Sequence, residues 1–249
     1  MADIIDKTAN LPVDEEIGAK EVSTPPASIG EMDYTAKYAD EFYEDYINSF
    51  EQRKSKKRLF RFFKRVFDIV TSALGLIILS PVFLGIAIAI KCDSKGPVIF
   101  RQDRVGKGGR LFVCLKFRSM RIDAPKNAPT SQLKDPEQYY TKVGKFLRKT
   151  SLDELPQLWC VFIGKMSLVG YRPLVPHEVK ANAMRARLGV FSMRPGITGH
   201  AQVMGRDGVY YKNKAILDAY YVKHASPWFD LKILFQTVGV VASFFMGKD

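Results

Sequence analysis

The sequence predicts a mainly helical α+β protein that lies on one face of a membrane. Three observations carry this prediction: an apolar stretch between two basic flanks, two short β-prone runs joined by glycines, and helical periodicity after residue 139. The chain has 249 residues, 47% of them hydrophobic. That length has room for one sizeable domain or two small ones.

Charge is distributed unevenly along the chain. Residues 1–52 carry 3 basic and 13 acidic side chains, a net charge of −10, so the whole-chain value of +12 leaves +22 for the remaining 197 residues. A basic body of this kind favours a polyanionic partner, and nucleic acid, anionic lipid and nucleotide phosphates are the candidates. We expect the acidic leader, residues 1–58, to be partly disordered, and its aromatic residues at every fourth position could form an amphipathic helix over 33–51.

The apolar stretch, residues 66–90, carries one charge, Asp68, in 25 positions. As a straight helix it would reach about 37 Å, more than the ~30 Å hydrocarbon core of a bilayer. Basic residues dominate both flanks, which predicts that both ends are cytoplasmic. We therefore expect a re-entrant helix over about 62–91, which enters and leaves the membrane by the same face. A kinked spanning helix and a buried helix of a soluble core are the alternatives.

Ser80 and Pro81 are expected to break this helix. Proline removes a backbone donor and clashes with the carbonyl four residues earlier, and the Ser80 hydroxyl can bond a backbone group that is freed by the break. Aromatic residues alternate with basic ones over 59–67, as is typical of a lipid headgroup interface. Residues 228–246 are expected to form a second interfacial element, an amphipathic helix.

Residues 98–102 and 111–117 are β-prone runs, and the segment between them contains Gly106, Gly108 and Gly109. This pattern predicts a β-hairpin with a glycine-rich turn. The turn could cradle a phosphate, but it lacks the full G-x-x-x-x-G-K-[ST] spacing, so a plain turn is the preferred interpretation.

The cysteine and histidine residues indicate neither a disulfide framework nor a zinc site. Cys92, Cys114 and Cys160 are odd in number and widely spaced. A reducing cytosol fits this usage. The acidic first residues lack the basic and apolar regions of a signal peptide, so we do not expect secretion.

Asp153 and Glu154 are adjacent carboxylates among several cations, and two interpretations compete for them. Ser151 and Glu154 fit a capping box, in which both side chains only satisfy a helix end. A carboxylate pair could instead hold Mg²⁺ or attack phosphorus, with arginines of the glycine-bearing segments 166–173 and 194–206 stabilising the charge of the transition state. The second interpretation favours phosphoryl transfer at a membrane face.

Seven short motifs occur in a fixed order: KRVFD at 64–68, LSP at 79–81, FRQ at 100–102, KFRSM at 116–120, SLDE at 151–154, GYRP at 170–173 and RPGITG at 194–199. Together they resemble the bacterial sugar transferase family, the monotopic polyprenyl-phosphate phosphoglycosyl transferases, in its minimal catalytic form. The resemblance covers about residues 59–246, within an expected catalytic domain 59–249. Tyr171 and His200 stand where the family often has Pro and Trp, a departure that bears on the sugar more than on the reaction.

The resemblance implies transfer of a sugar 1-phosphate from a UDP-sugar to undecaprenyl phosphate with release of UMP, at the cytoplasmic face of the bacterial inner membrane. This step would initiate assembly of an exopolysaccharide, capsule, O-antigen or glycoprotein glycan. Asp153 would be the nucleophile that forms a covalent phosphosugar intermediate, Glu154 would support it, and both would hold Mg²⁺. The implied phosphate or nucleotide contacts are Arg148, Arg172, Lys116, Arg118 and Arg206.

Two other classes of protein stay open on the sequence. A membrane-anchored basic protein that binds lipid or nucleic acid without catalysis would use Asp153 and Glu154 only as helix caps. An ordinary UDP-sugar glycosyltransferase would release UDP instead of UMP. The preferred interpretation predicts a UDP-sugar, undecaprenyl phosphate and membrane lipid as partners and no nucleic acid, and it leaves self-association open.

Overall fold

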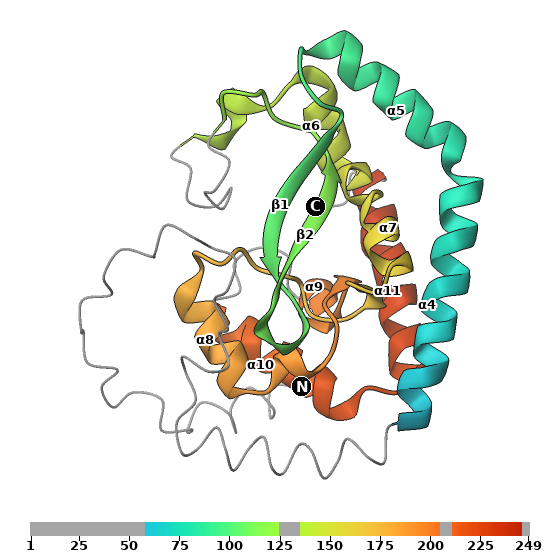
Figure 1. Ribbon diagram of the computed structural model, residues 1–249, viewed down its shortest axis with the longest axis vertical. Helices are drawn as coiled ribbons and strands as arrows, with labels where there is room; N and C mark the ends of the chain where they lie inside the picture. The colour runs from blue at the N-terminus through green and yellow to red at the C-terminus, as the bar shows by residue number, and fades with distance from the viewer. Residues whose placement is uncertain (1–57, 125–134, 205–210, 246–249) are drawn as a thin grey trace. The chain divides into compact units, whose positions relative to one another are not determined.

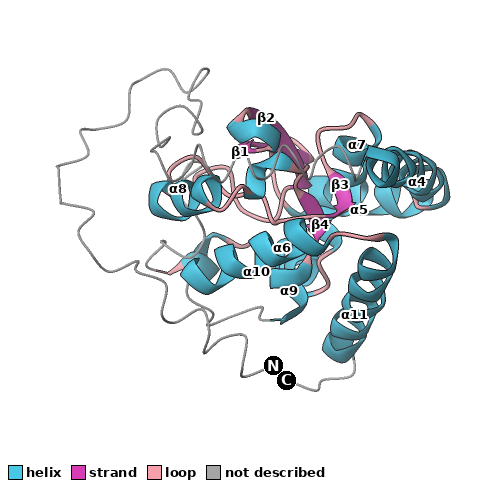
Figure 2. Cartoon of the chain, turned by 90° about the horizontal axis from the view of Figure 1, so that it is seen from below, coloured by secondary structure: helices cyan, strands magenta, loops and turns pink. Residues whose placement is uncertain are grey.

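The computed structural model describes residues 58–124, 135–204 and 211–245. Helix predominates in these ranges, and the strands form two short pairs (Figure 2). The prediction of a mainly helical α+β fold is therefore confirmed. The predicted helix 33–51, the leader before Arg58 and the candidate residue Arg206 lie outside the described residues.

The apolar stretch forms two helices, α4 (Arg58–Ile78) and α5 (Ser80–Asp93), which meet at an angle of 59° (Figure 1). Pro81 lies in the first turn of α5, where its missing N–H has no intrahelical acceptor to lose. The Ser80 hydroxyl donates to the Ile77 carbonyl at 2.8 Å. The predicted break is confirmed, although the two helices extend beyond the predicted range 62–91 at both ends.

In the part of the chain that the structure describes, no helix by itself has both the length and the apolar character needed to cross a bilayer. The bent pair α4 and α5 meets that requirement when its two helices are taken together. Large apolar side chains stand exposed on both helices: Leu59, Phe62, Phe63, Val66, Phe67, Ile69, Val70, Leu74, Ile77 and Ile78 on α4, and Val82, Leu84 and Ile88 on α5.

Polar contacts attach α4 to the rest of the domain. Asp68, the one charge of the apolar stretch, is 2% exposed and accepts hydrogen bonds from the Ser167 hydroxyl at 3.1 Å and the Leu168 N–H at 3.0 Å. Lys64 forms an ion pair of 2.6 Å with Asp230 of α11 (Pro227–Phe245). The helix also packs along α7 (Gln157–Phe162) (Figure 1). Asp68 is therefore an internal anchor and does not lie on the exposed apolar surface of α4.

The predicted hairpin is confirmed. Strands β1 (Ile99–Val105) and β2 (Leu111–Phe117) are antiparallel, and a 3₁₀ turn with Gly108 at φ 69° and Gly109 at φ 74° connects them. Only glycine adopts such positive φ angles without strain. Strand β1 lies further along the chain than the predicted run 98–102. A second sheet, in which β3 (Ser167–Val169) pairs in parallel with β4 (Gly196–Thr198), was not predicted.

The remaining helices are α6 (Lys142–Lys149), α8 (Val179–Arg187), α9 (His200–Met204) and α10 (Tyr211–His224). One core cluster surrounds Tyr171 and Val105, and another joins Val169 to Tyr221 and Ile233. The predicted helix over 228–246 is present as α11. Its Asp230 is buried, while its large apolar side chains Trp228, Leu231, Phe235 and Val238 are exposed.

Candidate active site

The chain changes direction sharply before the two candidate carboxylates. After α6 ends, Ser151 takes a left-handed conformation with φ 58° and ψ 15°. This conformation costs a non-glycine residue about 1–3 kcal/mol, and such strained residues cluster at functional sites. The 3₁₀ turn Leu152–Glu154 follows and buries Asp153, which is 7% exposed.

The capping-box interpretation of this segment is wrong. The Ser151 side chain makes no capping hydrogen bond to the 3₁₀ turn, and the residue that precedes the first turn of α7 is Pro156. The Glu154 carboxylate turns instead towards cations of two other segments. The two carboxylates therefore do not cap a helix, which favours the interpretation that they form a chemical site.

Glu154 is the centre of a charge cluster. Its Oε1 accepts hydrogen bonds from Lys116 Nζ of β2 at 2.7 Å and from Arg172 Nη2 at 3.1 Å. Burial works to raise the pKa of Glu154, but the charges and hydrogen bonds of Arg172 and Lys116 outweigh it and hold that pKa well below its usual range. Glu154 is thus permanently ionised at neutral pH. Its charge in turn raises the pKa of Arg172.

Asp153 lies beside this cluster in a different electrostatic state. Burial raises the pKa of its carboxyl and the neighbouring charge of Glu154 adds to that rise, while the charges of Lys116, Arg148 and Arg172 oppose it. Among the described residues, none donates a hydrogen bond to the Asp153 carboxylate. A carboxylate that is buried, surrounded by cations and not held by donors is suited to act as a nucleophile towards an anionic substrate.

Arg148 and Arg172 are both held in position by neighbouring residues. The Arg148 guanidinium stacks 4.6 Å above the centre of the Tyr140 ring. The backbone of Arg172 is held by Arg185, whose Nη1 donates to the Arg172 carbonyl at 2.7 Å. Arg185 is itself buried in an ion pair of 2.5 Å with Asp218 of α10. The fold thereby brings four predicted site cations and anions to Asp153: Lys116, Arg148, Glu154 and Arg172.

Arg118 is not part of this cluster. It is 5% exposed, and its guanidinium donates to the carbonyls of Ser94 and Lys95 at 2.7 and 2.6 Å. These contacts fix the turn that follows α5. The predicted role of Arg118 as a phosphate contact stays untested, but its donors hold the chain in this structure.

Arg104, which the sequence did not single out, also lies near the site. Arg104 lies opposite Phe112 in the hairpin, on the same face as Lys116, and its charge interacts with those of Arg172 and Glu154. Its Nη1 donates to the Pro173 carbonyl at 3.0 Å, which ties β1 to the segment after Arg172. The two-residue alternation of β1 and β2 could have indicated this residue, because it places every second side chain on one face.

The site fits a divalent cation only with help from a substrate. No group of three or more His, Cys, Asp or Glu in the described ranges is placed to hold a metal ion. However, both oxygens of Asp153 and Oε2 of Glu154 accept no hydrogen bond from the described residues. Mg²⁺ is commonly bound by one or two carboxylates together with substrate phosphates. Asp153 and Glu154 are therefore adequate ligands if a phosphate completes the coordination.

The structure combines an exposed apolar helix pair with a cluster of carboxylates and cations, an arrangement suited to an enzyme that acts on an anionic substrate. Comparison with known proteins makes the class specific. The family model for bacterial sugar transferases matches residues 59–244. The chain belongs to the bacterial sugar transferase family, and the resemblance seen in its motifs is confirmed.

Individual relatives agree with this assignment. The UDP-glucose:undecaprenyl-phosphate glucose-1-phosphate transferase of Klebsiella pneumoniae is 46% identical over 186 residues, which cover 71% of this chain and 39% of that protein. The undecaprenyl-phosphate galactose phosphotransferase of Salmonella typhimurium is 41% identical over 204 residues, 76% of this chain and 42% of that protein. The chain thus spans about two fifths of the length of these two relatives. The exopolysaccharide production protein ExoY of Sinorhizobium fredii is 38% identical over 193 residues, 72% of this chain and 84% of that protein.

Proposed function

We propose that this protein transfers a sugar 1-phosphate from a UDP-sugar to undecaprenyl phosphate and releases UMP, as the first membrane step in assembly of a surface polysaccharide. The names of the Klebsiella and Salmonella relatives support this donor, acceptor and reaction. The observation that carries the proposal is the buried Asp153 carboxylate, which accepts no hydrogen bond from the described residues. Beside it lies Glu154, whose lowered pKa keeps it ionised at neutral pH.

The reaction runs in two displacements at one phosphorus atom. An oxygen of Asp153 attacks the β-phosphorus of the UDP-sugar, the bond from that phosphorus to the bridging oxygen breaks, and UMP leaves with the electron pair. An oxygen of undecaprenyl phosphate then attacks the same phosphorus, the bond to Asp153 breaks, and the carboxylate is regenerated. The products are UMP and undecaprenyl diphosphate sugar.

The cations around Asp153 serve this chemistry electrostatically. Arg148 and Arg172 hold the phosphate oxygens, on which negative charge gathers in the transition state. Glu154 fixes Lys116 and Arg172 through Oε1, so that their charges are in place before substrate binds. Asp153 and Glu154 would hold Mg²⁺, which would supply positive charge to stabilise UMP as a leaving group.

We place the exposed apolar side chains of α4 and α5 in the membrane, with α11 at its surface. The 59° bend supports a re-entrant path, and burial of these side chains in lipid would remove from water an apolar surface that the domain itself leaves uncovered. The catalytic cluster then faces the cytoplasm, where UDP-sugars are available, and a lipid-borne phosphate reaches it along the membrane surface.

Mass measurement of the intact protein tests the covalent step. The full chain is incubated with Mg²⁺ and either UDP-glucose or UDP-galactose, without lipid acceptor, and UMP release is measured in parallel. Both sugars are used because relatives carry names for each. A mass increase of one phosphosugar together with UMP is expected, and it should be absent in Asp153→Asn.

Asp103→Asn is the matched control, because Asp103 is an exposed aspartate of β1 and lies outside the cluster. It should form the adduct like the parent protein. An adduct that persists in Asp153→Asn would move the nucleophile elsewhere. Release of UDP would favour an ordinary glycosyltransferase, and folded protein that turns over no donor from a wider panel of UDP-sugars would favour a binding protein without catalysis.

A further inference from the structure

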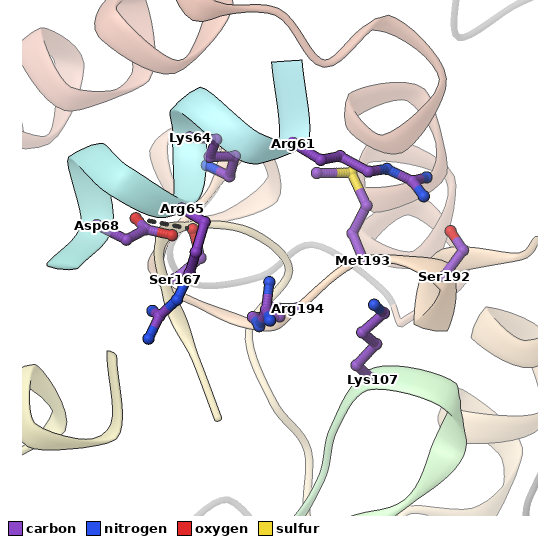
Figure 3. Close-up of a pocket in the computed structure, with 9 residues that line it drawn as sticks. All are labelled: Arg61, Lys64, Arg65, Asp68, Lys107, Ser167, Ser192, Met193 and Arg194. Atoms are coloured by element: carbon purple, nitrogen blue, oxygen red, sulfur yellow. Dashed lines mark hydrogen bonds between the residues drawn. The ribbon is translucent and has the colours of Figure 1, made fainter. Parts of the chain in front are cut away.

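A second charged site lies apart from the catalytic cluster, in a pocket beside the first turns of α4. The pocket shares no lining residue with the cluster around Asp153, and several separate segments of the chain meet in it (Figure 3). Its lining residues are Arg61, Lys64, Arg65, Asp68, Lys107, Ser167, Ser192, Met193 and Arg194. Its volume of about 90 Å³ exceeds the ~10–15 Å³ that one water molecule needs on the same measure, so it has room for a small polyatomic ion.

Positive charge dominates the lining of this pocket. Five cationic side chains face one carboxylate, that of Asp68, which is 2% exposed and already accepts two hydrogen bonds from β3. Asp230 neutralises Lys64 from outside the lining. The lining itself therefore combines five cationic side chains with one carboxylate, a composition that favours an anion.

Two of the guanidinium groups are oriented by neutral acceptors. Arg65 donates to the carbonyls of Val161 and Phe162 at 2.7 and 2.8 Å, and Nε of Arg194 donates to the Gly164 carbonyl at 2.8 Å. Backbone carbonyls carry no formal charge, so these bonds fix the positions of the groups without cancelling their charges. The charges of Arg65 and Arg194 consequently repel each other. An anion bound between them would relieve that repulsion.

The glycine-rich turn of the hairpin contributes to this pocket. Lys107, in the turn between β1 and β2, reaches it from the side opposite α4, as Figure 3 shows. The turn therefore presents a side-chain cation to the pocket, without the backbone cradle of a phosphate-binding loop. Arginine and lysine together are the residues that proteins use most to hold phosphate oxygens.

We propose that this pocket is a phosphate-binding site, distinct from the catalytic cluster. The phosphate could belong to an anionic phospholipid headgroup or be free in solution. The exposed aromatic side chains of Phe62, Phe63 and Phe67 on the same helix put the pocket next to the apolar surface that we assign to lipid, within reach of a headgroup. Such a site would set the depth and orientation of α4 at the membrane.

Charge-neutralising variants test the site through binding alone. The pocket variant combines Arg61→Gln with Lys107→Gln. Its control combines Arg58→Gln with Arg110→Gln, exposed residues of the same helix and the same hairpin connection that do not line the pocket. Both variants lose the same net charge, so non-specific attraction to anions falls equally in each. Thermal unfolding of the two variants checks that both remain folded.

Two arms separate the two sources of phosphate. Equilibrium dialysis of the full chain in a non-ionic detergent measures binding of inorganic phosphate. Flotation with vesicles of phosphatidylcholine, with or without phosphatidylglycerol, measures recognition of an anionic headgroup. In at least one arm the pocket variant should bind about tenfold more weakly than the control, because charge-assisted contacts to phosphate are lost.

Each pattern of results decides the proposal. A selective loss in the dialysis arm alone assigns the site to free phosphate, and a selective loss that depends on phosphatidylglycerol assigns it to a headgroup. Equal behaviour of the two variants in both arms, or no saturable binding by the parent chain in either arm, would overturn the proposal.

Discussion

Replacement of Glu154 by Gln should lower the free energy of unfolding by about 1–3 kcal/mol at pH 7. The bond to Lys116 is largely buried, with side-chain exposures of 19% and 17%, and a charge-assisted bond in such a setting contributes about 1.5–3 kcal/mol. The Arg172 side chain is 47% exposed, so solvent limits its share to ~1 kcal/mol at most. The glutamine carbonyl retains one neutral hydrogen bond, which offsets about 0.5–1.5 kcal/mol of the loss.

The loss should depend on pH in a defined direction. In the folded protein the pKa of Glu154 lies well below its usual range, because Arg172 and Lys116 outweigh the opposing effect of burial. In the unfolded chain that pKa is about 4.3. The ionised carboxylate therefore stabilises the fold fully above the unfolded pKa and progressively less as the pH falls below it. The difference between parent and variant should shrink from pH 7 towards acid.

Thermal unfolding of the full chain in detergent measures this effect. A loss of 1–3 kcal/mol corresponds to a Tm lower by roughly 2–12 °C for a chain of this size. Glu137→Gln is the matched control, because the Glu137 pair with Lys145 is exposed and 3.9 Å long. That control should stay within about 0.5 kcal/mol of the parent. Equal Tm values for the two variants, or a difference that is unchanged in acid, would refute the central role of ionised Glu154.

Three further predictions concern the reaction and the α4–α5 pair. In the protein without Mg²⁺, burial should keep the pKa of the Asp153 carboxyl above the ordinary value of ~3.9. An NMR titration of that carboxyl that gives a pKa at or below this value would contradict the buried environment assigned to it. Asp68→Asn should lower the free energy of unfolding by about 1–3 kcal/mol, because an amide weakens two buried hydrogen bonds to β3. A Tm equal to that of the control Asp103→Asn would show that the anchor is dispensable. Pro81→Ala should straighten the helix pair and so place its two flanks on opposite faces of sealed vesicles. Impermeant thiol labelling of cysteines introduced at positions 57 and 95 measures this. Labelling of both positions on one face would show that Pro81 does not set the bend.

The break in the apolar stretch could be predicted because its cause is local. Pro81 and Ser80 act on backbone groups within four residues of themselves, and the structure bends there. The start of α4 was predicted at about residue 62, whereas the helix begins at Arg58. Its first two turns carry Arg61, Lys64 and Arg65 among phenylalanines, and these charges make the turns look like a basic flank of the apolar stretch.

The environment of the carboxylates could be predicted only in part. Asp153 and Glu154 are adjacent in sequence, but the partners of Glu154 are 38 and 18 residues away and come from other elements. Local sequence also fits a capping box, and only the tertiary position of Lys116 and Arg172 decides against it. The three-residue strands β3 and β4 are too short to show any periodicity, which is why their parallel pairing was missed.

The attachment of α4 through Asp68 has a consequence for the order of events during synthesis. The N–H of Leu168 finds its acceptor on a helix made 100 residues earlier, so β3 cannot complete its bonding until α4 is in its final place. The outer face of α4 is apolar and would be exposed on the ribosome throughout that interval. The apolar face of α4 therefore needs to be shielded from water and from other chains before residue 168 emerges and β3 can complete its bonds.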